Sequence, residues 1–273
     1  MEKTFYVAAT PLGNLADAST RLKAVIESCP VIAAEDTRVA RRLLSAMGIK
    51  GKKIVSLREH NEAATATTLA EASDGDICYL SDAGTPAVSD PGARAVAIFR
   101  AAGWKTVPVP GPCAAGAAMS VAGISGDGFV FVGFLPRARA RARARLLQAA
   151  AIDLPIIIYA SPRTAGADID LIAAIDAQAQ VCVCREISKV HEQIVAAPVA
   201  QIATMIKDAA ILPERGEFTL VAKIARPEID ATAQQVAQLL AEHLPAAKAA
   251  RLAGRICGAD GRALHRMLSA SKK

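Results

Sequence analysis

The stretch DICYLSDAGTPAVSDPG, residues 76–92, joins a short apolar run to an exit crowded with small residues and carboxylates. Its first part, 76–80, has the length and composition of a buried strand, and the Gly and Pro residues that follow are typical of a turn. The exit offers hydroxyls at Ser81 and Thr85 and a carboxylate at Asp82. Since ligands of open parallel sheets bind beyond the carboxyl ends of the strands, this exit is a candidate site.

The same alternation of strand, turn and helix continues through most of the chain. Runs typical of strands lie at 4–9, 30–34, 53–57, 76–80, 106–110, 129–134, 155–160, 181–184 and 218–224. Ala-rich stretches of helical period lie at 17–28, 37–47, 61–73, 91–102, 114–121, 139–150, 165–176 and 199–208. This order predicts an α/β protein with largely parallel sheets and helical crossovers.

Three regions are expected. The Gly- and Asp-containing segment 122–128 suits a linker, so we predict one α/β domain at 1–121 and a second at 122–228. A helical tail at 229–273 follows, in which residues 244–268 read as helix, short turn and helix, similar to a helix-turn-helix. The alternative is a helical hairpin that packs on the second domain and carries basic residues for solubility.

Composition and charge narrow the class of protein. Of the 273 residues 52% are hydrophobic and 4% aromatic, and no window approaches the roughly 20 apolar residues of a membrane span. The N-terminus lacks the pattern of a signal peptide, so we expect a cytoplasmic protein. The net charge of +6 is concentrated in the arginines of 137–145 and in residues 235–273. Two basic segments in an otherwise mildly acidic chain indicate a polyanionic partner.

Metal and nucleotide-phosphate sites are not expected. The six Cys residues show no C-x-x-C spacing, and the alternation in VCVC directs Cys182 and Cys184 to one sheet face, as structural thiols. The four His residues are widely separated, so no metal site is predicted. The chain has no Walker-type phosphate loop, and GISGDG precedes a strand where a dinucleotide fingerprint must follow one.

The other predicted strands of the first domain also end in turn-forming and polar residues. These exits are TPLGN at 10–14, EDTR at 35–38, REHNE at 58–62 and GPCAAG at 111–116, besides SDAGTP at 81–86. One such exit alone would be an ordinary turn, whereas five in series favour one shared cleft. Its backbone, hydroxyls and carboxylate suit a small ligand with positive groups and a ribose.

A family resemblance rests on motifs that occur in order: YVAATPLGNLAD, AAEDTR, HNE, SDAGTPAVSDPG, VPGPCAA, GFLPR and CREISKVHEQ. From about Phe5 to Lys223 the chain resembles the tetrapyrrole methylase superfamily, in its branch of small-subunit ribosomal RNA methyltransferases. The resemblance implies two α/β domains with S-adenosyl-L-methionine in the cleft between them, usually in a homodimer. It also implies 2′-O-methylation of a cytidine ribose in the decoding region of 16S rRNA.

The same resemblance assigns roles to residues of this chain. Those expected to bind the cofactor are Pro11, Ser81, Asp82, Thr85, Cys113, Ala114 and Ala160. Cys113 reads as a small packing residue, with a nucleophile as the alternative. Ser89-Asp90-Pro91 reads as a helix N-cap followed by proline at the first helical position. One departure is YASPRT at 159–164, where the family commonly shows YESPHR.

Methyl transfer to a hydroxyl requires removal of a proton, and Glu35, Asp36 and His60 are the candidate general bases. For Asp36 the alternative role is to cap the helix that follows. Arg38 and Arg58 are expected to hold RNA phosphates, with ordinary surface charge as the alternative.

The run PRARARARARL contributes Arg137, Arg139, Arg141, Arg143 and Arg145. On a helix these side chains would spread over opposing faces, whereas in a strand or extended loop they would share one. We expect a flexible basic arm that becomes ordered on RNA, together with Arg262 and Arg266 of the tail. A solvated charge run is the alternative. For the whole chain, the competing functions are a tetrapyrrole C-methyltransferase and a noncatalytic RNA-binding factor of the same fold.

Overall fold

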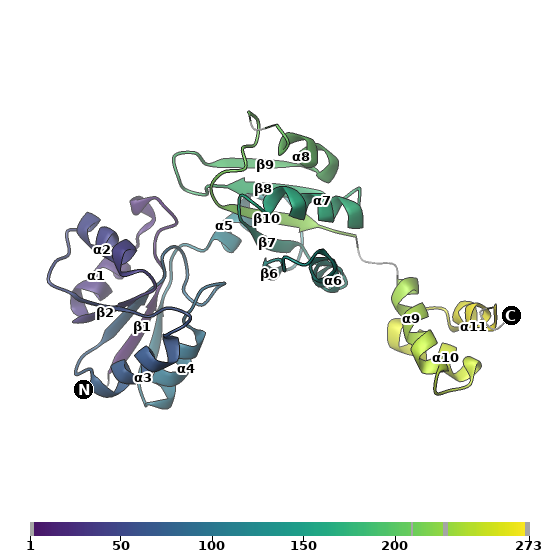
Figure 1. Ribbon diagram of the computed structural model, residues 1–273, viewed down its shortest axis with the longest axis horizontal. Coiled ribbons are helices and arrows are strands. Elements are labelled where there is room, and N and C mark those ends of the chain that lie inside the picture. Colours follow the sequence, from purple (N-terminus) through teal and green to yellow (C-terminus); the bar gives the residue numbers. More distant parts are fainter. Residues whose placement is uncertain (1–2, 209, 226–228, 271–273) are drawn as a thin grey trace.

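The computed structural model describes residues 3–208, 210–225 and 229–270. Two five-stranded sheets, each covered by helices, are followed by three C-terminal helices (Figure 1). The α/β fold predicted from the alternation of strands and helices is confirmed, and so is a helical tail.

The first sheet is parallel throughout, as predicted. Its strands are β1 (Thr4–Ala8), β2 (Val31–Ala34), β3 (Lys53–Ser56), β4 (Ile77–Leu80) and β5 (Lys105–Val109), in the order β3-β2-β4-β1-β5. All carboxyl ends therefore meet at one edge of the sheet.

Both faces of this sheet are covered by helices, because successive strand residues point to opposite sides. On one face, Cys78 and Leu80 pack with α1 (Thr20–Ser28) and α2 (Thr37–Ala46). On the other, Ile77 and Tyr79 pack with α3 (Glu62–Ala72) and α4 (Ala93–Ala101). A short 3₁₀ helix, η1 (Leu15–Asp17), precedes α1, which begins at Thr20 where the sequence predicted a helix from residue 17.

The second sheet corrects the prediction of largely parallel strands. It consists of β6 (Val130–Phe134), β7 (Ile156–Ala160), β8 (Gln180–Arg185), β9 (Gln193–Pro198) and β10 (Phe218–Lys223), in the order β6-β7-β10-β8-β9. Only β6 and β7 pair in parallel, whereas β7–β10, β10–β8 and β8–β9 are antiparallel. The sequence pattern did not predict β9, because it is an edge strand with alternate residues exposed and lacks a continuous apolar run.

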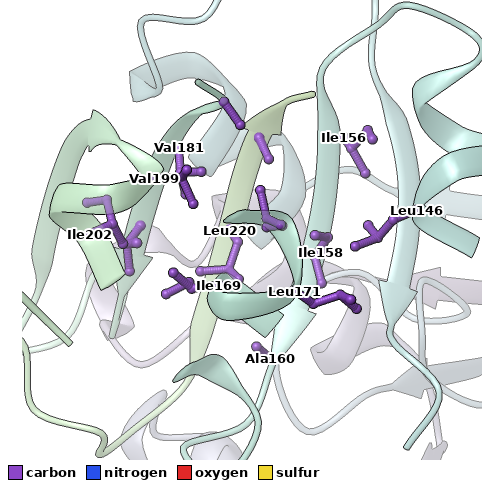
Figure 2. Packing of buried hydrophobic residues seen from close by; sticks show 14 of the residues in the cluster. Leu146, Ile156, Ile158, Ala160, Ile169, Leu171, Val181, Val199, Ile202 and Leu220 are labelled. Carbon is purple, nitrogen blue, oxygen red and sulfur yellow. The ribbon is translucent and has the colours of Figure 1, made fainter. Parts of the chain in front are cut away.

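The main core of the second domain lies between this sheet and three helices, α6 (Arg139–Ala150), α7 (Ala165–Ile175) and α8 (Val199–Met205). Figure 2 shows Leu146 of α6, Ile158 of β7 and Leu220 of β10 pointing into this core. Helix α6 settles the conformation of the arginine run, because from Arg139 onward the run is helical and not extended.

Helix α5 (Ala114–Val121) packs on the opposite face of the second sheet, although the sequence pattern assigned it to the first domain. Its Ala115 and Ala118 contact the cluster that includes Cys182 and Cys184, whose Sγ atoms lie 3.8 Å apart. Both thiols therefore face one side, as predicted. In packing terms, the chain crosses between the sheets before α5 and not at 122–128, whose Gly and Asp residues form an ordinary loop within the second unit.

The tail comprises α9 (Ile229–Ala241), α10 (Ala246–Cys257) and α11 (Gly261–Ala270). Its buried residues, among them Ala237, Ala253 and Leu264, form a core of their own. Gly258 ends α10 at φ 68°, the left-handed conformation that glycine adopts without a Cβ penalty. In Figure 1 the three helices lie apart from both sheets, so the alternative of a hairpin packed on the second domain does not hold.

Within the described ranges, no helix combines the length and apolar character needed to cross a bilayer.

Candidate functional site

A cavity of about 320 Å³ opens where the carboxyl edge of the first sheet faces the second sheet. This volume is within the range of about 300–1,000 Å³ usual for small-molecule sites. From the first sheet it is lined by Leu12 after β1, Glu35 after β2, residues 82–85 and 88–90 after β4, and Cys113 and Ala114 after β5. From the second sheet it is lined by Phe134, residues 159–162, Ile187 and residues 217–219.

The loops after β1, β4 and β5 are fastened to one another by hydrogen bonds. Thr10 and Gly84 exchange backbone hydrogen bonds of 2.8 and 3.0 Å. The Ser81 hydroxyl donates to the Gly84 carbonyl at 3.0 Å, and the Thr85 hydroxyl donates to the Pro112 carbonyl at 2.9 Å. This network holds the strand ends together around the cavity, as the shared-cleft prediction requires.

Glu35 and Asp82 form a linked pair of carboxylates. The Asp82 backbone N–H donates to Glu35 Oε2 at 3.4 Å, and the Asp36 backbone N–H donates to Asp82 Oδ1 at 2.9 Å. Burial raises the pKa of both carboxyl groups, and for Glu35 the neighbouring Asp82 charge raises it further. Together they give this end of the cavity a negative potential that suits a positively charged ligand.

The structure of residues 87–92 shows that the predicted N-cap at Ser89-Asp90-Pro91 is wrong. Helix α4 begins at Ala93, and its N-cap residue is Gly92, which has no side chain to cap the helix. The Glu62 carboxylate instead accepts hydrogen bonds from the N–H groups of Gly92 at 3.0 Å and Ala95 at 2.8 Å. Residues 87–91 form a loop, and Asp90 faces the cavity.

A second cavity of about 390 Å³ adjoins the first. Its walls include Arg58, Glu59 and His60 from the exit of β3, together with Asp36 and Pro91. Glu35, Asp82, Ser89 and Asp90 line both cavities. The β3 exit thus joins the same edge, but on the side away from the second sheet.

The residues predicted to bind a cofactor divide into two groups. Those that line the first cavity are Asp82, Thr85, Cys113, Ala114 and Ala160. Pro11 and Ser81 are not in its wall; the Ser81 side chain is 4% exposed and bonded within its turn. Their neighbours Leu12 and Asp82 occupy the lining positions instead.

Of the predicted bases, Glu35 lines both cavities and His60 lines the second. Asp36 has the capping role that was its alternative, because its carboxylate accepts from the Arg38 backbone N–H at 2.8 Å. The Arg38 guanidinium also binds it, at 2.6 Å, and this hydrogen bonding holds the Asp36 pKa well below its usual range. A carboxylate with such a low pKa is a weak proton acceptor. Arg58 donates from Nε to the Glu35 carbonyl at 3.2 Å.

The second domain supplies a wall of which the family resemblance indicated only Ala160. Tyr159 contributes its ring, and its hydroxyl accepts from the Ala115 N–H at 3.2 Å. Residues 217–219 begin β10, where nothing in the sequence pattern marks a strand start as a site. In the loop at 159–164, whose sequence differs from the family motif, Ser161 and Pro162 line the cavity, whereas Arg163 is exposed.

The two domains contact each other directly beside this cavity. The Ser188 hydroxyl donates to Asp17 Oδ2, and the Lys189 stem lies so close to Gly13 that a Cβ there would be 2.5 Å from Lys189 Cγ. Gly133 in β6 approaches Ser89, where a Cβ would be 2.8 Å from the Ser89 hydroxyl. Lys189 also pairs with Glu217, at 3.0 Å, at the edge of the cavity.

Basic side chains gather on two surfaces. The five arginines of 137–145 are all exposed, while Ala142 and Leu146 of the same helix are buried against the second sheet. In the tail, a hollow of about 650 Å³ between α10 and α11 is lined by Arg251, Arg255, Arg262, His265 and Arg266, among others. The residues that the structure describes include no group of three or more His, Cys, Asp or Glu side chains suited to a metal ion.

The fold and the site together define the class: an α/β protein of two domains that encloses a small-molecule cavity between them. The family described as Tetrapyrrole (Corrin/Porphyrin) Methylases matches residues 4–203. Among solved structures, a cobalt precorrin-4 methyltransferase has a TM-score of 0.61 at 15% identity, covering 82% of this chain and 96% of that one. A diphthine synthase has a TM-score of 0.60 at 13% identity, covering 81% and 89%. At these identities the likeness establishes the fold alone.

Curated relatives are much more similar in sequence. The ribosomal RNA small subunit methyltransferase I of Neisseria meningitidis serogroup B is 41% identical over 268 residues, which is 96% of this chain and 91% of that protein. The protein of the same name from Escherichia coli O157:H7 is 37% identical over 267 residues, 96% and 93% of the two chains. The chain therefore belongs to the tetrapyrrole methylase family, in its branch of ribosomal RNA small subunit methyltransferases I.

Proposed function

We propose that this protein methylates the 2′-hydroxyl of a cytidine ribose in the decoding region of 16S rRNA, with S-adenosyl-L-methionine as the methyl donor. The observation that carries the proposal is the pair of adjoining cavities at one sheet edge, in a chain that is 41% identical to a ribosomal RNA small subunit methyltransferase. One cavity has the volume and charge for the donor, and the other has cationic side chains for a phosphate-bearing substrate.

The first cavity fits the donor chemically. Glu35 and Asp82 offer negative charge to its positive groups, and the small residues Gly84 and Ala114 leave room for close backbone contact. When bound, S-adenosyl-L-methionine supplies a methyl group activated by its positively charged sulfur. The residues that would hold it are Asp82, Thr85, Cys113, Ala114 and Ala160, with Pro11 and Ser81 in support behind the wall.

The second cavity is suited to the ribose that receives the methyl group. Arg58 and His60 line it, and a phosphate on either side of the target ribose would meet their positive or hydrogen-bonding groups. Holding the hydroxyl in line with the donor contributes much of the rate, because oriented reactants are worth about 7–11 kcal/mol of the barrier. Glu35 and His60 are the bases that the sequence predicted and that lie at this cavity, and Arg38 remains a proposed phosphate contact.

The two basic surfaces support a large RNA substrate. Helix α6 exposes all of its arginines, and α10 and α11 surround a hollow rich in arginine. Few aromatic side chains are available for stacking on bases, so recognition by shape and phosphate contact is expected. A tetrapyrrole C-methyltransferase, the second candidate, shares the fold but has no use for these arginines.

Replacing the five arginines of 137–145 by glutamine tests the role of α6. Each phosphate interaction removed in this way should reduce the slope of log affinity against log salt by about 0.7–0.9. Glutamine preserves helix propensity, so the fold should persist. A matched control replaces the tail arginines Arg251, Arg255, Arg262 and Arg266 in the same way. If the salt dependence of RNA affinity is unchanged in both variants, RNA does not bind at either basic surface.

Enzyme assays test the whole proposal. The protein is incubated with labelled S-adenosyl-L-methionine and either small ribosomal subunits, naked 16S rRNA or a precorrin, and methylated nucleotides are mapped by mass spectrometry. We expect label in the RNA as 2′-O-methylcytidine. Label in the precorrin alone would support the second candidate. No heat on titration with the donor up to millimolar concentration would instead support a noncatalytic RNA-binding factor.

The assembly and place of action belong to the same proposal. We expect a homodimer acting in the cytoplasm, where ribosomal subunits are assembled. Light scattering coupled to size-exclusion chromatography gives the mass of the particle, and a mass of a single 28.3 kDa chain at micromolar concentration would contradict the dimer.

A further inference from the structure

Asp90 lies in the wall that separates the two cavities. It lines both, and it shares this position only with Glu35, Asp82 and Ser89 among the described residues. A group at this boundary can reach a substrate hydroxyl in the second cavity while the donor occupies the first. The wall therefore contains candidates for the group that removes the hydroxyl proton.

The other members of the wall are less suited to accept a proton. The Glu35 and Asp82 carboxylates each accept a backbone N–H, from Asp82 and Asp36 respectively. Ser89 carries a hydroxyl, which is a poor base at neutral pH. The Asp90 carboxylate forms no hydrogen bond or ion pair within residues 3–208, 210–225 and 229–270, so its oxygens are available to a ligand.

The loop that presents Asp90 is held in a strained conformation by specific contacts. Ala87 and Ser89 have φ values of 66° and 65°, a left-handed region that residues with a Cβ rarely occupy. The Pro91 carbonyl accepts hydrogen bonds from the Ala87 N–H at 3.1 Å and from the Tyr79 hydroxyl at 2.9 Å. Such strain persists where the surroundings over-determine a conformation, and here it aims Asp90 at the boundary.

We propose that Asp90 is a catalytic residue that accepts the proton of the ribose hydroxyl during methyl transfer. The proposal rests on the proposed function. The O–H bond of the hydroxyl breaks and its proton moves to a carboxylate oxygen of Asp90. The hydroxyl oxygen forms a bond to the methyl carbon with a lone pair, while the bond from that carbon to sulfur breaks and leaves its electron pair on sulfur.

The surroundings of Asp90 give it the basicity that this step requires. Burial, followed by the charges of Glu35, Asp82 and Glu217, raises the pKa of its carboxyl group to about 7. Lys189 is bound to Glu217, while Arg58 and His60 face the boundary from the second cavity. A base with a pKa near the working pH is substantially deprotonated and still binds a proton strongly enough to favour its transfer.

The test compares Asp90→Asn with Asp90→Glu, and with Asp74→Asn as an exposed control outside both cavities. Single-turnover methylation of small subunits is followed from about pH 5.5 to 9, and donor affinity is measured by calorimetry. We expect Asp90→Asn to lose about 10²–10⁴-fold in rate, with donor affinity nearly unchanged. The rise of the wild-type rate through about pH 7 should disappear, and Asp90→Glu should recover part of both.

Two results would overturn the assignment. One is a near-wild-type rate for Asp90→Asn. The other is a loss of rate that is matched by a loss of donor affinity, with the pH profile of the wild type retained, because that result indicates a structural role.

A separate measurement does not depend on turnover: carboxyl-¹³C NMR of the wild type and Asp90→Asn isolates the titration of Asp90. Titration near the ordinary aspartate pKa of about 4 would refute the proposal even if RNA were not the substrate. An inactive wild type with Asp90 titrating near 7 would count against the proposed function alone.

Discussion

Replacing Gly133 by alanine should both destabilise the protein and weaken donor binding, because this glycine serves two purposes at once. It lies in β6 at φ 64°, where the register between β6 and β7 shifts, and its Cα faces Ser89 across the domain junction. A left-handed conformation costs a residue with a Cβ about 1–2 kcal/mol. The new Cβ would also lie 2.8 Å from Ser89 Oγ, closer than such atoms approach.

The two contributions can be separated with a matched glycine. Gly48 has φ 75° and no atom within 4 Å of the point that a Cβ would occupy, so Gly48→Ala carries the backbone penalty alone. For domains of 150–250 residues about 1 kcal/mol corresponds to about 2–4 °C in Tm, which gives an expected fall of about 2–8 °C for Gly48→Ala. Gly133→Ala should fall further by the cost of moving Ser89.

Differential scanning calorimetry measures the Tm, and titration calorimetry measures affinity for S-adenosyl-L-methionine. Only Gly133→Ala should weaken donor binding, since Ser89 lines the cavity. Combining Gly133→Ala with Ser89→Ala removes the close oxygen and should restore affinity while the backbone penalty stays. Equal effects of Gly133→Ala and Gly48→Ala on both measurements would refute the view that this contact sets the geometry of the junction.

Three further predictions concern charge and packing. Asp82→Asn should weaken donor affinity about 10-fold or more, because a charged partner is removed. RNA affinity, measured by filter binding, should stay nearly constant, and equal losses of affinity for both ligands would contradict this prediction. Ile158→Ala, in the core of Figure 2, should lower the free energy of unfolding by about 2–5 kcal/mol in urea titrations, and a much smaller loss would indicate a core that collapses around the gap. Burial raises the pKa of Asp168 to about 6, so the folded state holds its proton where the unfolded state has lost it, and stability falls as pH rises from about 4 to 6. Asp168→Asn should therefore gain stability over the wild type across that interval, and a constant difference between the two would exclude the linkage.

The sequence pattern predicted the first sheet well because its strands are largely buried between two layers of helices. Continuous apolar runs such as Ile77–Leu80, separated by helical stretches, define parallel strands with little ambiguity. The second sheet was harder, since β9 is an edge strand and the β8–β9 connection has no helix. Antiparallel pairing depends on which strands meet in space, and that information is not local in sequence.

The candidate site was predicted in outline but not in detail. The strand exits correctly indicated one edge, yet Ser-Asp-Pro is typical of a helix start and predicted a different place for Asp90. The actual partner of that helix end is Glu62, which is 30 residues away in the chain and could not be identified from local pattern. The wall formed by residues 217–219 depends on how the second sheet faces the first, which no motif encodes.

The shared boundary of the two cavities has a consequence for inhibitor design. A single compound with a cationic nucleoside at one end and a phosphorylated sugar at the other could occupy both spaces past Asp90. Since joining two ligands makes the second association intramolecular, such a compound should bind far more tightly than either half. The half that meets Arg58 and His60 would occupy the second cavity, which the donor half alone leaves open.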